Sequence, residues 1–94
     1  MSKLISIADF IDVALYTLKK IDINDSVNFK SFKKDRQVEI RKLDSDLFEI
    51  KEDGFEKRLF KNLDTKELKR ALKYLRKKEF PKSNSLWYKI IRNK

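Results

Sequence analysis

The sequence contains neither cysteine nor histidine. Without cysteine the chain can form no disulfide and no thiolate metal site. Without histidine it lacks the most common metal ligand and the most common general base. It also contains no phosphate-binding glycine loop, nucleophile elbow or zinc motif. We therefore expect no cofactor, no metal site and no enzymatic activity.

Long apolar segments are also missing. Met1–Phe10 lacks the basic start, apolar run and cleavage site of a signal peptide. No stretch is long enough to cross a bilayer. The 94 residues suffice for one hydrophobic core but not for two. We expect a single domain over residues 1–94 that is cytoplasmic and does not bind membranes.

Charged residues are abundant, and the excess of positive charge is unevenly distributed. The net charge is +9. Residues 64–94 contain eleven Lys or Arg against three acids, whereas residues 1–63 contain thirteen against twelve. Such an asymmetry favours an anionic partner, although an AT-rich genome, which raises the lysine content of proteins, can produce part of it. Seven Phe, three Tyr and one Trp indicate a folded chain with an aromatic core.

The segment Ile7–Lys20 has the spacing of an amphipathic helix. Ser6 and Asp9 approximate a capping box at its start. Its apolar side consists of Ile7, Phe10, Ile11, Ala14, Leu15 and Leu18.

A second helix is predicted from Asp64 to about Lys78 or Glu79. Asp64 and Glu67 resemble a capping box, and Pro81 cannot continue the helix. Its core side consists of Leu68, Ala71, Leu72 and Leu75.

Alternation of apolar and polar residues predicts four strands. They cover approximately Val38–Arg41, Phe48–Lys51, Phe55–Lys61 and Leu86–Arg92. Asp53-Gly54 is the strongest hairpin signal in the chain. Residues 21–36 are expected to form a loop with a short helical turn after Asp25.

The predicted element order is α-β-β-β-α-β. We expect a two-layer α+β sandwich, with an antiparallel meander plus a fourth strand and both helices on one sheet face. A right-handed return through the second helix would place the last strand parallel to the first and beside it.

The second helix also carries a strongly basic side, opposite its core side. At about 100° per residue, six cations fall within one arc. We call this arc the cationic face; it comprises Lys66, Lys69, Arg70, Lys73, Arg76 and Lys77. It is the predicted site for DNA or RNA phosphates, with help from Lys78, Lys82, Arg92 and Lys94. The alternative is an ordinary solvated helix side.

The uncovered sheet face is a second candidate surface. A basic and aromatic platform for single strands could form from Arg41, Lys51, Phe55, Lys57, Trp87 and Lys89. Glu39 and Glu49 should share that face, so cross-strand ion pairs are the simpler interpretation.

Two further functions remain open. The protein could dock an acidic protein partner or form a homodimer, using Val13, Tyr16, Trp87 and Ile91 as apolar contacts. It could also be a metal-independent ribonuclease that uses Tyr74 and Tyr88 beside the cationic face. We rank these hypotheses below nucleic-acid binding.

Overall fold

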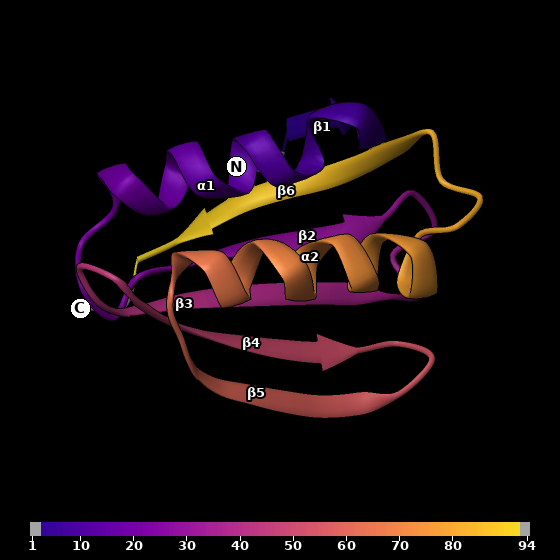
Figure 1. Ribbon diagram of the computed structural model, residues 1–94. Helices are drawn as coiled ribbons and strands as arrows, with labels where there is room; N and C mark the ends of the chain where they lie inside the picture. Colours follow the sequence, from indigo (N-terminus) through magenta and orange to yellow (C-terminus); the bar gives the residue numbers. More distant parts are fainter. Residues whose placement is uncertain (1–2, 93–94) are drawn as a thin grey trace.

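Six antiparallel strands and two helices account for most of residues 3–92, the part of the chain that the computed structural model describes. The strands are β1 (Lys3–Ser6), β2 (Ser26–Ser31), β3 (Gln37–Asp44), β4 (Leu47–Asp53), β5 (Lys57–Leu63) and β6 (Ser85–Ile91). They lie in the order β1-β6-β2-β3-β4-β5 (Figure 1). A 3₁₀ turn, η1 (Ile7–Asp9), leads into α1 (Phe10–Lys20), and α2 (Thr65–Glu79) connects β5 to β6.

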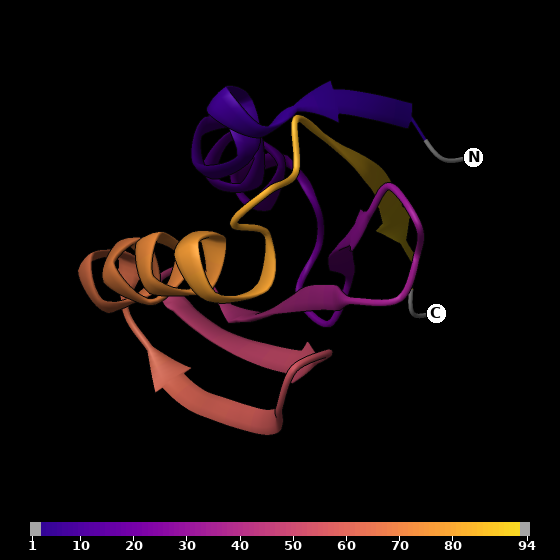
Figure 2. The same cartoon turned by 90° about the vertical axis from the view of Figure 1, so that its right-hand side faces the viewer.

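The two helices lie on the same side of the sheet, which bends around them (Figure 2). Between the layers, the ring of Phe10 meets Phe29 and Phe80 edge to face, at centroid distances of 4.8 and 5.7 Å. Such contacts add to the stabilisation from buried apolar area. The α+β class and the placement of both helices on one face are therefore confirmed. We call the opposite side of the sheet the open face.

The start of the second helix is confirmed, but the first α-helix begins at Phe10 and not at Ile7. Ile7–Asp9 forms a 3₁₀ turn, and the Asp9 side chain makes no capping hydrogen bond, so the predicted Ser6/Asp9 capping box is wrong. The Ser6 hydroxyl accepts a hydrogen bond from the Ala8 N–H at the first turn. Asp64 and Glu67 form a reciprocal capping box at the start of α2. These contacts satisfy backbone N–H groups that have no partner within a helix.

The expected loop at residues 21–36 is wrong, because Ser26–Ser31 forms strand β2. Val27 and Phe29 alternate with polar residues and are fully buried. The alternation is hard to recognise in the sequence because Phe32, three residues after Phe29, does not continue it. The Phe32 side chain is 61% exposed and lies outside the strand.

The expected strand count and order are also wrong. β1 was not predicted, because a four-residue edge strand has no local signal and pairs only with β6. β6 does not lie parallel to β3. It lies between β1 and β2 and runs antiparallel to both. β2 occupies the position beside β3, so no parallel pair forms and the right-handed crossover rule does not apply.

Candidate nucleic-acid interface

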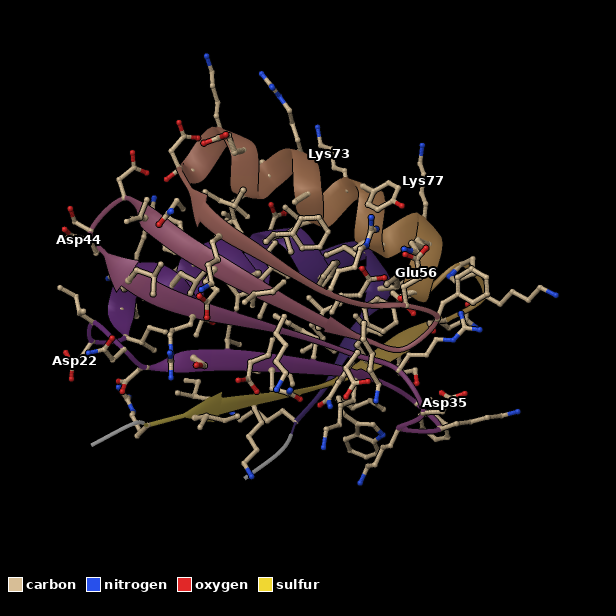
Figure 3. All side chains as sticks on the ribbon, turned by 90° about the horizontal axis from the view of Figure 1, so that it is seen from below. Asp22, Asp35, Asp44, Glu56, Lys73 and Lys77 are labelled. Carbon is tan, nitrogen blue, oxygen red and sulfur yellow. The ribbon has the colours of Figure 1, made fainter. Side chains whose placement is uncertain are left out.

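The cationic face of α2 points away from the sheet. Leu68, Leu72 and Leu75 are fully buried on the opposite side of the helix. Five of the six cations are exposed, and Arg76 is half-buried. Figure 3 shows Lys73 and Lys77 extending outward from α2. None of the six forms an ion pair with a residue in the described part of the chain.

Three carboxylates gather at the first turn of α2. Asp64 and Glu67 belong to the capping box, and Asp46 accepts hydrogen bonds from the backbone N–H and the hydroxyl of Thr65. The hydroxyl and the N–H of Thr65 hold the pKa of Asp46 below its ordinary value. These anions suit the positive end of the helix dipole. They also reduce the positive field around Lys66, so the cationic face is most uniform from Lys69 to Lys77.

The four further cations that were expected to help bind phosphates do not all add positive charge to this face. Lys78 Nζ lies 3.1 Å from Glu52 Oε2 and 2.8 Å from Glu56 Oε1. Arg92 donates to Asp25 Oδ2 at 3.0 Å. Lys82 is exposed, and Lys94 lies outside the described residues. The positive charges of Lys78 and Arg92 are therefore compensated by neighbouring carboxylates. They add little to the cationic face, although Lys78 directly follows Lys77 in the sequence.

Lys78 belongs to a partly buried group of charges that was not predicted from the sequence. We call it the carboxylate cluster; it comprises Glu52, Glu56, Arg58, Lys78 and Glu79. The side chains of Glu52 and Glu79 are fully buried. Arg58 Nε donates to Glu52 Oε1 at 3.1 Å. Glu79 Oε1 accepts a hydrogen bond from the Phe55 N–H at 2.8 Å. The cluster thereby fastens the β4–β5 hairpin to the end of α2.

The pKa values of the two buried carboxyls of this cluster are shifted in opposite directions. Burial raises the pKa of Glu79, and the hydrogen bond to Glu52 raises it further. Burial also opposes ionisation of Glu52, but hydrogen bonds from Glu79, Lys78 and Arg58 hold its pKa below the ordinary value. Glu79 is accordingly the member of the pair that retains the proton more readily.

Gly54 makes room for the Glu79 carboxylate in this hairpin. A Cβ at residue 54 would overlap Glu79 Oε1 and come within 3.0 Å of Arg36 Cβ. We expect Gly54→Ala to lower the free energy of unfolding by about 2 kcal/mol, measured by urea denaturation. In a Glu79→Ala background the loss should be clearly smaller. An equal loss in both backgrounds would contradict this explanation.

The open face is divided into two halves of different chemistry. On β3 and β4, Arg41 lies opposite Glu49, and Lys51 lies opposite Glu39. Lys57 on β5 lies opposite Asp53. The basic residues predicted as a platform are therefore interspersed with acids on this half. Strands β1, β6 and β2 contain no acidic residue.

The predicted platform is not continuous. Trp87 and Lys89 lie on the half of the open face without acids, whereas Arg41, Lys51 and Lys57 lie on the other half. Phe55 is in the turn between β4 and β5, where its ring lies 5.9 Å from the Arg36 guanidinium.

The residues of the other two hypotheses are also separated. Val13 and Tyr16 are on α1, whereas Trp87 and Ile91 are on β6. The Tyr88 hydroxyl forms a hydrogen bond with Thr17 at 3.0 Å. Tyr74 instead accepts a hydrogen bond from Arg58 at 3.0 Å. Tyr74 and Tyr88 thus have different partners and do not form one site.

Comparison with known proteins found no family model, no curated protein and no solved structure that matches the chain. None of the described helices is long and apolar enough to cross a membrane. Among residues 3–92, no group of three or more acidic side chains is arranged to hold a metal ion.

Proposed function

We propose that the protein binds nucleic acid through the cationic face of α2, by contacts to phosphates. The supporting observation is that five exposed cations share one helix side without a carboxylate partner among the described residues. Like charges at i and i+4, such as Lys69 and Lys73, repel each other. A polyanion bound along the helix would remove this repulsion and release counterions.

The proposed binding has low sequence specificity. α2 contains neither Asn nor Gln, the side chains that most often read adenine. Lysine and arginine contacts to phosphates position a protein on nucleic acid but carry no direct sequence information. Duplexes of different sequence should therefore bind with similar affinity.

Titration of labelled duplex DNA, single-stranded DNA and RNA at several salt concentrations tests this function. If all six cations contact phosphates, the logarithm of the association constant should fall with a slope of about −5 against the logarithm of the salt concentration. Absence of binding at low salt would end the proposal. Binding that does not depend on salt would require a different surface.

The alternative function is docking to an acidic protein through the same cations. Tyr16 is 61% exposed on α1 and would supply an apolar contact. Pull-downs that survive nuclease treatment, combined with sedimentation at several protein concentrations, would favour this alternative or a homodimer. RNA cleavage in EDTA would instead support the ribonuclease hypothesis.

A further inference from the structure

An exposed aromatic and basic patch lies on the half of the open face that has no acids. We call it the Trp87 patch; it comprises Leu4, Lys30, Phe32, Lys34, Trp87 and Lys89. The strand register places Leu4, Trp87 and Lys30 side by side across β1, β6 and β2. Leu4 is 48% exposed and Phe32 is 61% exposed. The patch therefore presents apolar surface to solvent beside lysines.

Phe32 and Trp87 form a stacked pair at the centre of this patch. Their ring centroids are 5.9 Å apart, and the ring planes differ by 18°. Trp87 Nε1 donates a hydrogen bond to the Phe32 carbonyl oxygen at 3.1 Å. Lys34 Nζ lies 5.1 Å from the centroid of the indole ring. The indole is thus held in place, and the more exposed Phe32 ring is available to extend the stack.

The loop that presents Phe32 is held by Ser31. The Ser31 N–H donates to the Arg36 carbonyl oxygen at 2.9 Å, and its hydroxyl donates to Asp35 Oδ1 at 2.6 Å. The Arg36 N–H in turn donates to the Ser31 hydroxyl oxygen at 3.2 Å. These bonds order the loop before any ligand arrives, which lowers the entropy lost on binding.

The charge around the stacked pair favours an anion. Asn28 donates to Gln37 and Glu39, and these contacts separate the patch from the acidic half of the sheet. Asp35 is the acid of the adjoining loop, and its carboxylate accepts the Ser31 hydroxyl. Lys30, Lys34 and Lys89 form no ion pair within residues 3–92.

We propose that the Trp87 patch is a second nucleic-acid site, specific for single strands. An unpaired base stacks on Phe32, and the surrounding lysines contact the adjacent phosphates. A duplex keeps its bases paired and stacked internally, so it cannot use this contact. The site lies on the open face, away from the cationic face of α2, and therefore does not depend on the function proposed for that helix.

Trp87 is the single tryptophan of the chain, so its fluorescence reports on this site directly. We expect oligothymidylate to change the emission in a saturable manner. The duplex of the same strand with oligoadenylate should leave the emission unchanged. An acidic peptide serves as a third ligand, and a change with the peptide but not with the single strand would identify a protein-binding surface and overturn the proposal.

Substitution of Phe32 separates stacking from simple charge attraction. Phe32→Leu should weaken binding of oligothymidylate about tenfold, whereas Phe32→Tyr should retain it. Phe55→Leu is the matched control, because Phe55 is 70% exposed in another turn. It should leave the affinity unchanged. Equal affinity of the Phe32→Leu variant and the wild-type protein for the single strand would overturn the proposal.

The two proposed sites can fail separately. Loss of all single-strand binding on reversal of the α2 charges, with no effect of Phe32→Leu, would leave the α2 function and remove the Trp87 site. Single-strand binding that depends on Phe32 but not on the α2 charges would support the Trp87 site and count against the function proposed for α2.

Discussion

The triple variant Lys69→Glu, Lys73→Glu and Lys77→Glu is expected to lose duplex binding by on the order of 100-fold at low salt. Each substitution removes one phosphate contact and adds a repulsive charge. The slope of the salt dependence should also become shallower by about three, one for each lost contact. Electrophoretic mobility shifts or fluorescence anisotropy with a labelled duplex would measure both quantities.

The fold should tolerate this triple substitution. All three side chains are exposed, and none belongs to the ion pairs of the described residues. Glutamates among the remaining Lys and Arg residues also reduce like-charge repulsion along α2. The circular dichroism spectrum and the urea midpoint should therefore stay close to those of the wild-type protein.

A second triple variant controls for net charge. Lys20→Glu, Lys57→Glu and Lys61→Glu change the net charge of +9 by the same amount, but these lysines lie on α1 and β5. If binding depends on the cationic face, this control should retain most of its duplex affinity. Equal losses in the two variants would show that total charge, and not the α2 face, attracts the nucleic acid.

Glu52→Gln is expected to lower the free energy of unfolding by about 3 kcal/mol at neutral pH. The Glu52 carboxylate is fully buried and faces Lys78 and Arg58 at 3.1 Å each. A neutral amide would leave these cations with only Glu56, which is partly exposed, as their carboxylate partner. Urea denaturation at neutral pH measures the loss.

Glu79→Gln should not lower the free energy of unfolding, although Glu79 is as buried as Glu52. An amide at residue 79 can still accept the hydrogen bond from the Phe55 N–H, and its NH₂ group can donate to Glu52. It loses only the longer hydrogen bond, at 3.4 Å, from the Glu56 N–H. It also removes the cost of ionising a carboxyl whose pKa is raised by burial and by Glu52. We therefore expect a stability equal to or above that of the wild-type protein at neutral pH. A loss as large as that of Glu52→Gln would contradict the assignment.

The pH dependence of the two variants follows from the signs of the shifts. Glu79 has a raised pKa in the folded chain, so its stabilising contribution is complete below about 4.5, the ordinary value, and declines as the pH rises through the folded pKa. The stability of Glu79→Gln relative to the wild-type protein should therefore increase as the pH rises. Glu52 has a lowered pKa, so its contribution is present above 4.5 and declines as the pH falls through the folded pKa. The deficit of Glu52→Gln should therefore shrink in acid.

The helices and the β4–β5 hairpin could be predicted because their signals are local. Each signal lies within or next to the element that it defines. These signals are the capping residues Asp64 and Glu67, the helix-ending Pro81 and the Asp53-Gly54 turn. β1 and β6 pair with each other although they lie at opposite ends of the sequence, and no local sequence pattern predicts such a contact.

The carboxylate cluster could have been detected from periodicity. Glu52 follows Phe48 and Ile50 at every second position, which places it on the buried side of β4. Glu79 follows Leu75 by four residues, which places it on the core side of α2. Acids in phase with two apolar patterns indicate buried carboxylates. The Phe32–Trp87 stack has no comparable signal, because its two rings come from segments far apart in the sequence.

The position of β6 between β1 and β2 also determines the order in which the protein can assemble. Strands β2 to β5 pair with their sequence neighbours, so this ladder requires only short loops to close. β1 gains its sheet partner only after Ser85–Ile91 has been synthesised. During translation, β1 can therefore join the sheet only after β6 has been made. Until then the exposed edge of β2 is open to pairing with other chains.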